Sequence, residues 1–315
     1  MGKILVVGLC CVDLVSYVQK YPAEDSDTRV FDQRTSLGGN AANNAVVLAQ
    51  LEAKRQADGG GQSAEESGAE LFASMPTGNV MLDDLVQRTG IRVRRVERPN
   101  ATLPISTVIV NELTGTRTIL HFRGTLPELT LEEFAAEFPR LDDFSWVHFE
   151  GRNFDEVLRM LDYCRSKRDP ARTRISLELE KIRPFPWYER MIPLADVLFV
   201  SKDFARNLGF TSMETAVCGL HERYQLPHTT VIVPWGELGV AGRCGMDGEL
   251  VVQAAFPPPK VVDTLAAGDS FIAAALFFLN AGRPLRETLE AAARLAGRKC
   301  GQRGLTDLEL SGLPL

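Results

Sequence analysis

The amino-acid sequence predicts an α/β protein with a doubly wound, mainly parallel sheet that is flanked by helices. From about residue 146 onward, short runs of Val, Ile, Leu and Phe alternate with longer segments of helical character. This alternation is typical of a parallel sheet with helices on its faces. Near the start of the chain, residues 3–9 (KILVVGL) are almost entirely apolar, as expected for a central strand that is buried on both faces.

Residues from about 12–36 and 101–122 contain strands that we expect to form a second, smaller sheet, which would serve as a lid. The first pair of strands flanks a polar turn, YPAEDSDT. The second pair flanks NELTGT, a favourable hairpin sequence.

The remaining predicted elements follow the same alternation. Strands are predicted at residues 146–149, 174–179, 197–201, 229–234 and 261–262. Helices are predicted at residues 81–89, 154–168, 284–295 and 296–300, and two more begin near Asn40 and near Gly268 and Asp269. Residues 54–70 are rich in Gly, Ser, Glu and Ala, which predicts a flexible surface insertion.

The composition suits one large α/β domain or two small ones, and we expect a single domain that spans residues 1–315. The chain is 45% hydrophobic, which is enough for a full core. A formal net charge of −6 without a basic block argues against nucleic acid or an anionic membrane as a partner. The six cysteines lack C-x-x-C spacing, and the N-terminus lacks a cleavage site and a lipidation motif. We therefore expect free thiols and a cytoplasmic protein.

Residues 261–279 (VVDTLAAGDSFIAAALFFL) combine a strand end, a turn of small residues and the start of an apolar helix. Unpaired N–H groups at a helix start attract anions, and small residues let a phosphate approach the backbone. A lone Asp at a helix start is usually a cap. Beside an anion site, however, Asp269 would be placed to take a proton from a hydroxyl group that attacks a phosphoryl group.

A second group of polar residues follows the two glycines of LGGNAANNA. Asn40 and Asn43 lie three residues apart and share one face at a helix start. In isolation, Asn40 would be a helix cap and Asn43 a surface residue. Together with Asp13, which follows the first strand, they can instead form a set of donors and acceptors for sugar hydroxyl groups.

Polar or small residues follow several of the predicted strands. Ligands of doubly wound sheets bind outside the carboxyl ends of the strands, so we expect these residues to gather at one rim. The set comprises Asp13, Glu150, Glu180, Ser201, Gly236 and Asp263.

The segment DTLAAGDSF resembles the signature D-T-x-[GA]-A-G-D-x-F of the ribokinase-like (PfkB) sugar kinases. The resemblance implies a ribokinase-like fold with a small β-sheet lid, and the transfer of phosphate from ATP to a sugar hydroxyl group. Asp269 would be the general base. The backbone of Ala266, Ala267 and Gly268 would hold the charge of the transferred phosphoryl group, with Ala266 where some members carry Gly.

The resemblance also assigns residues to the sugar. The G-G-N-x-x-N segment matches the sugar-binding motif of these kinases, and Arg117 matches an arginine near the substrate and the transferred phosphate. The expected sugar contacts are Asp13, Gly39, Asn40, Asn43 and Asp269. Asp25 would reach the sugar of a neighbouring copy in a homodimer that is formed through the lid.

The resemblance further implies a nucleotide site that comprises Lys202, Trp235, Gly236, Glu237, Gly239, Gly268, Gly297 and Cys300. Many members carry N-x-x-E where this chain has SKDF at residues 201–204, so no metal ligand is assigned. Glu180, Lys202 or the nucleotide itself would take over that role. The implied cofactors are ATP and Mg²⁺, with K⁺ as a further cation.

Longer segments of the resemblance, among them TLPISTVIVNELTGTRT and GRKCGQRG, imply a ketose acceptor, namely fructose at its 1-hydroxyl group. Two alternatives stay open. One is a kinase for another small alcohol, such as ribose, a 2-keto-3-deoxy sugar acid or a nucleoside. The other is a catalytically silent member that binds sugar or nucleotide.

Overall fold

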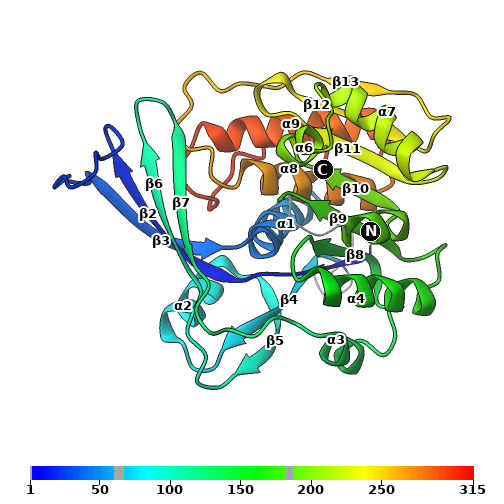
Figure 1. Cartoon of the computed structure of the whole chain (residues 1–315), viewed down its shortest axis with the longest axis horizontal. Coiled ribbons are helices and arrows are strands. Elements are labelled where there is room, and N and C mark those ends of the chain that lie inside the picture. Colours follow the sequence, from blue (N-terminus) through cyan, green and yellow to red (C-terminus); the bar gives the residue numbers. More distant parts are fainter. Residues whose placement is uncertain (1, 60–66, 182–186) are drawn as a thin grey trace.

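The computed structural model describes residues 2–59, 67–181 and 187–315. A nine-stranded sheet runs through its centre in the order β13-β12-β11-β10-β9-β8-β1-β4-β5 (Figure 1). The pairs from β11 to β5 are parallel, whereas β12 and β13 run antiparallel to their neighbours, which confirms the mainly parallel α/β class. The strands are β1 (Lys3–Val7), β4 (Ala69–Pro76), β5 (Arg92–Arg98), β8 (Phe144–Glu150), β9 (Arg174–Leu179), β10 (Val197–Val200), β11 (Thr230–Pro234), β12 (Val240–Cys244) and β13 (Val251–Gln253).

Helices cover both faces of this sheet because successive strand residues point to opposite faces. In β1, Ile4 and Val6 belong to one apolar cluster, and Leu5 and Val7 to the other. The first cluster includes α1 (Asn40–Ala57), α2 (Val80–Thr89), α8 (Ala267–Asn280) and α9 (Leu285–Cys300). The second includes α3 (Leu131–Glu137), α4 (Phe154–Lys167), α5 (Trp187–Met191), α6 (Lys202–Asn207) and α7 (Met213–Tyr224).

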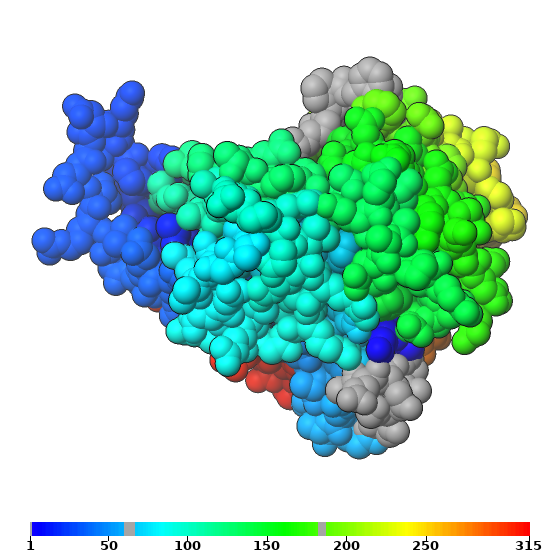
Figure 2. All heavy atoms as spheres, turned by 90° about the horizontal axis from the view of Figure 1, so that it is seen from below, coloured from blue at the N-terminus to red at the C-terminus, as the bar shows by residue number. Residues whose placement is uncertain are grey.

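The second, four-stranded sheet confirms the predicted small sheet and has the order β3-β2-β6-β7. Its strands are β2 (Cys11–Val18), β3 (Asp32–Gly38), β6 (Ile105–Asn111) and β7 (Thr116–Phe122). β6 and β7 form the expected hairpin, and β2 pairs with β6 in parallel. We call this sheet the lid. Figure 2 shows the connection between β2 and β3, in blue, extending away from the body of the molecule.

Two predicted elements near the C-terminus are wrong. Residues 261–262 do not form a strand, and Val261 is 40% exposed. The amides of Val262 and Asp263 donate instead to the carbonyl oxygen of Cys300, so this segment packs along the end of α9. In addition, the two helices predicted at 284–295 and 296–300 are one continuous helix, α9, since Leu295 and Ala296 at the predicted junction are strong helix formers and the single Gly297 does not end the helix.

The predicted flexible insertion at residues 54–70 is too long at both ends. Helix α1 continues to Ala57, and β4 begins at Ala69. Polar residues misled the prediction because they lie on structured elements: Arg55 pairs with Glu52 at 2.8 Å. Residues 60–66 of the predicted insertion lie outside the described residues.

Within the described ranges, no helix is both long enough and apolar enough to cross a membrane. All six cysteines are free thiols, as expected.

Candidate active site

An open cleft of about 670 Å³ lies between the carboxyl ends of the parallel strands and the lid. Its size falls in the range of small-molecule sites, about 300–1,000 Å³. Glu150, Glu180 and Ser201 line it, as expected for residues at the ends of β8, β9 and β10. Asp13 lines it too, but from within the lid strand β2. Asp263 follows no strand and is fully buried, and neither it nor Gly236 belongs to the lining.

The start of α8 forms one wall of the cleft. Ala266 has a left-handed backbone (φ 59°) and supplies no side-chain cap, so the N–H groups of the helix start that follow Ala267 can bind a ligand. Ala266, Gly268 and Asp269 line the cleft. Ala267 does not, and its N–H group donates to the carbonyl oxygen of Thr264 at 3.3 Å.

The start of α1 faces the start of α8 across the cleft, and side chains connect the two. Asn43 Nδ2 donates to Asp269 Oδ2 at 2.7 Å. One turn earlier, Asn40 Nδ2 donates to Glu178 Oε1 and to Glu180 Oε2, both at 2.9 Å. Neither asparagine is a simple cap or a surface residue, because both of them orient acids in the cleft.

Among the described residues, Asp269, which is 8% exposed, forms no ion pair. Burial raises the pKa of Asp269 to about 7, the charges of Glu180 and Glu150 add to the rise, and the hydrogen bond from Asn43 and the charge of Arg117 oppose it. Burial also raises the pKa of Glu178 well above its usual range. A carboxyl group with a pKa near 7 can accept a proton at neutral pH.

Asp13 is held on the lid side of the cleft. Burial raises its pKa, and hydrogen bonds from Ser106 and Cys11 oppose that rise. A Cβ atom on Gly38, which pairs with Cys11 on the neighbouring strand, would lie 2.1 Å from Asp13 Oδ1. The first glycine of the G-G-N segment therefore leaves room for the carboxylate of Asp13.

The second glycine shapes the turn into α1. Gly39 has φ 94°, and a Cβ atom there would lie 2.5 Å from the carbonyl oxygen of Leu9. Glu150 supports the same turn, because its Oε2 accepts the N–H groups of Leu9 at 2.8 Å and Ala41 at 3.3 Å. Gly39 lines the cleft and lets the backbone approach a ligand.

Arg117 links the lid to the loop before α8. It lines the cleft, and its Nη1 donates to Thr264 Oγ1 at 3.0 Å. Thr264 Oγ1 in turn donates to the carbonyl oxygen of Gly115 in the β6–β7 turn at 3.1 Å. The guanidinium group thus lies beside the open helix start.

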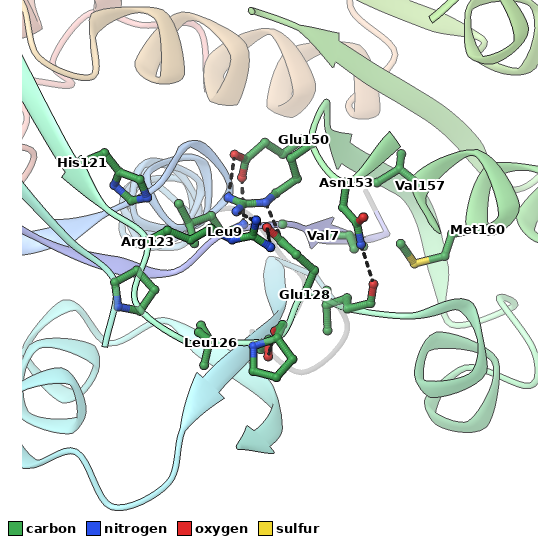
Figure 3. A pocket seen from close by; sticks show the side chains of 16 residues that line it. Val7, Leu9, His121, Arg123, Leu126, Glu128, Glu150, Asn153, Val157 and Met160 are labelled. Carbon is green, nitrogen blue, oxygen red and sulfur yellow. Dashed lines mark hydrogen bonds and ion pairs between the residues drawn. The ribbon is translucent and has the colours of Figure 1, made fainter. Parts of the chain in front are cut away.

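A side pocket of about 30 Å³, room for roughly one water molecule, adjoins the cleft (Figure 3). Dashed lines in the figure mark ion pairs of Arg152, which contacts Glu128 at 2.7 Å and Glu150 at 3.3 Å. The charge of Glu150 is therefore partly balanced, and this pocket is too small for a sugar.

The residues predicted for the nucleotide divide into two groups. Lys202 and Gly268 line the cleft, and Lys202 forms an ion pair of 3.0 Å with Glu237. The other predicted residues lie outside the lining of the cleft; they are Trp235, Gly236, Glu237, Gly239, Gly297 and Cys300.

Packing explains why two residues of the second group, Trp235 and Gly297, do not line the cleft. Trp235 is 2% exposed and belongs to the core, with the guanidinium group of Arg206 5.6 Å from its ring. A Cβ atom on Gly297 would lie 1.9 Å from the carbonyl oxygen of Phe256, so this glycine lets the 256–263 segment approach α9. Asp25 also lies outside the cleft, at the exposed connection between β2 and β3.

Sequence reasoning assigned no role to Ser106 and Lys299, and it left Glu178 as either part of a metal–water shell or a solvated strand edge. Glu178 carried a signal, since it is an acidic residue inside an apolar strand, and it is 5% exposed. Lys299 carried another, because it continues the buried stripe of α9 at helical spacing from Leu295 and Ala292. Ser106 carried none, since its contact with Asp13 depends on the pairing of β2 with β6.

The residues that the structure describes include no cluster of three or more His, Cys, Asp or Glu side chains that could hold a metal ion. Glu150, Glu178 and Glu180 line the cleft, and Mg²⁺ usually binds one or two carboxylates plus substrate phosphates and keeps several waters.

Comparison with known proteins gives a consistent result. Residues 1–310 match the model of the pfkB family carbohydrate kinases. The chain is 37% identical to mouse ketohexokinase over 310 residues, which cover 96% of this chain and 97% of that protein.

Solved structures share the fold. A putative ribokinase from Agrobacterium tumefaciens has a TM-score of 0.78 at 22% identity, over 96% of this chain and 92% of its own. A ribokinase from Arabidopsis thaliana, complexed with ribose and ATP, has a TM-score of 0.72 at 19% identity, over 96% and 94% of the two chains. The predicted ribokinase-like fold is thus confirmed.

Proposed function

Because this chain belongs to the pfkB family of carbohydrate kinases and is a phosphotransferase with an alcohol group as acceptor, we propose that it transfers phosphate from ATP to the 1-hydroxyl group of fructose. Its identity of 37% with mouse ketohexokinase supports a ketose as the acceptor. The observation that carries the proposal is the position of Asp269, a buried carboxylate at an open helix start and in contact with Asn43.

The sugar would lie between the lid and the start of α1. Asp13, Asn40 and Asn43 line this part of the cleft and offer both donors and acceptors to hydroxyl groups. Asn43 already holds Asp269, so a sugar hydroxyl bound beside Asn43 would lie next to the base. Asp269 would take the proton as the hydroxyl oxygen attacks the γ-phosphorus atom.

The charge of the transferred phosphoryl group would be met by the start of α8. N–H groups and the positive end of the helix dipole stabilise negative charge, and Arg117 adds a full positive charge. Such stabilisation and alignment supply most of the rate in phosphoryl transfer. Gly268 leaves the approach open, since a Cβ atom there would meet nothing within 4 Å.

The nucleotide would enter beside Lys202, which lines the cleft at the end of β10. We retain Trp235, Gly236, Glu237, Gly239, Gly297 and Cys300 as proposed elements of its surroundings. Mg²⁺ would bridge the phosphates and neutralise their charge, with Glu180 as the nearest candidate among the carboxylates. K⁺ remains a proposed further cation.

We infer that the chain forms a homodimer through the lid. It exposes a set of large apolar side chains, namely Tyr21, Val30, Phe31, Leu113, Ile119, Leu120 and Phe122. A second copy would cover them. Asp25, at the tip of this sheet, would then extend into the cleft of the partner.

A coupled assay of ADP release tests the proposal. The purified chain is given ATP and Mg²⁺ with fructose, ribose, tagatose or adenosine, and without any acceptor. We expect the highest kcat/KM with fructose and a product phosphorylated at the 1-position. Preference for ribose or adenosine would instead indicate a kinase for another acceptor, and no ADP release with any acceptor would indicate a silent binding protein.

A further inference from the structure

Lys299, near the end of α9, forms a fully enclosed ion pair with Asp263. The side chains of Lys299 and Asp263 are 0% and 1% exposed, and Lys299 Nζ lies 3.0 Å from Asp263 Oδ2. Nζ also donates to the main-chain oxygen of Asp263 at 2.9 Å. One ammonium group therefore holds both the side chain and the backbone of a loop residue.

The carboxylate of Asp263 connects its own loop to two other segments. Its Oδ1 accepts the N–H group of Leu265, two residues ahead, at 2.8 Å. Its Oδ2 accepts the N–H group of Gly304 at 3.2 Å and the hydroxyl group of Tyr17 at 3.5 Å. The loop before α8, the turn after α9 and the lid strand β2 thus meet at one charged group.

This arrangement fixes the backbone that leads into α8. The turn closed by Asp263 and Leu265 directly precedes Ala266, a non-glycine residue with a left-handed backbone (φ 59°), which is an unfavourable conformation for a residue that carries a Cβ atom. Surrounding contacts must hold such a conformation. Because the N–H groups at the start of α8 follow directly, their direction depends on the loop that Asp263 holds.

We propose that Lys299 is a positioning residue of phosphoryl transfer, whose ammonium group holds Asp263 so that the start of α8 faces the transferred phosphoryl group. This inference rests on the proposed kinase function. Lys299 is fully buried and does not line the cleft, so it would act through the loop. Because Tyr17 contacts the same carboxylate, the pair also links the lid to the loop that receives the phosphate.

The chain offers a matched ion pair with a structural role alone. Arg168, whose side chain is 6% exposed, binds Asp196 at the opposite end of the strands, with Nη2 2.9 Å from Oδ1. Asp196 also accepts the N–H group of Ile175, the second residue of β9, at 2.7 Å. This pair is remote from the cleft, so its removal should affect stability and leave catalysis unchanged.

The test compares Lys299→Met with Arg168→Met in steady-state kinetics and thermal unfolding. We expect Lys299→Met to lower kcat by about 100-fold or more, the scale for losing one donor to the developing charge, with KM for the sugar within about threefold. Arg168→Met should lower Tm and keep kcat per folded molecule within about twofold. In Lys299→Ala, added methylammonium should restore at least about tenfold of the lost kcat, because a small cation can refill the site.

A Lys299→Met protein with kcat within about threefold of the wild type and a reduced Tm would overturn the inference. If Lys299→Met does not fold, Lys299→Met/Asp263→Asn removes both charges and avoids an unpaired one. A folded double variant with full kcat would also overturn it, whereas one with low kcat and normal sugar KM would support it. A wild-type chain that phosphorylates no acceptor would remove the kinase proposal and this inference together. An active wild type with an unaffected Lys299 variant would remove this inference alone.

Discussion

Four carboxyl groups of this molecule are almost equally buried but differ in whether they form an ion pair. Glu52 and Glu70 are 5% and 6% exposed, and Glu178 and Asp269 are 5% and 8% exposed. Glu52 and Glu70 each pair with an arginine, at 2.8 and 2.7 Å. Within the described part of the chain, Glu178 and Asp269 have no ion-pair partner and accept hydrogen bonds from neutral asparagines. The second pair lies in the cleft.

Burial alone would raise the pKa of all four groups. At Glu52 and Glu70, the hydrogen bonds and charges of the arginines outweigh burial and lower the pKa. At Glu178 and Asp269, burial prevails and neighbouring carboxylates add to it. The cleft thus keeps acids whose charge is not balanced, which costs stability and suits proton transfer near neutral pH.

The two pairs should therefore respond to pH with opposite signs. The pKa of Glu70 in the folded state lies below its usual value of 4.5. Glu70 therefore stabilises the fold at pH values above 4.5, and this contribution is lost as the pH falls through the folded pKa. Asp269 is the reverse: between 3.8 and about 7, its folded state binds more protons than the unfolded chain. Its contribution to stability therefore falls as pH rises through this window and is constant above it.

Asp269→Asn gives the largest expected effect. General-base catalysis contributes about 10²–10⁴-fold, so kcat should fall by about 10³-fold, with sugar binding nearly intact. Tm at pH 8 should rise, because a neutral amide replaces a buried charge that has no cationic partner. Activity and calorimetric binding of the sugar are measured side by side. Activity within tenfold of the wild type would refute the role of Asp269 as the base.

Glu180→Gln tests, through the pH dependence of kcat/KM, whether neighbouring carboxylates raise the pKa of Asp269. Because the charge of Glu180 contributes to the raised pKa of Asp269, its removal should lower that pKa. We expect the acid limb of kcat/KM, near pH 7 in the wild type, to move to lower pH in the variant. Rates between pH 5 and 9 measure this shift. An unmoved limb would mean that Asp269 does not titrate in the profile.

Glu70→Gln gives the smallest effect and serves as the matched control for Asp269→Asn. It breaks the pair with Arg94, whose side chain is 42% exposed, so solvent screening limits the loss to about 1 kcal/mol. Tm should fall by about 1.5 °C, with kcat unchanged. Thermal unfolding at pH 7 measures this loss. A rise in Tm here, or a fall in Asp269→Asn, would break the distinction between the two pairs of acids.

The sequence alone was sufficient for features that neighbouring residues determine. The helix start at residues 266–269, the hairpin of the lid and the alternation of strands and helices all follow from local patterns. The resemblance to the ribokinase-like kinases, and not the local pattern alone, selected Asp13, Asn40, Asn43 and Asp269, which the structure brings to one cleft. The local pattern failed at residues 261–262, because β-branched residues favour a strand only where a partner strand is available.

Only the tertiary structure decided which buried charges are balanced. The pKa of Asp269 depends on Glu150 from β8 and Glu180 beyond β9, and the pairing of Lys299 depends on a loop 36 residues away. Electrostatic energies depend on distance and on solvent exposure, and both are set when remote segments pack together. The sequence therefore specifies which residue types line the cleft, whereas the protonation states of their carboxyl groups depend on the folded structure.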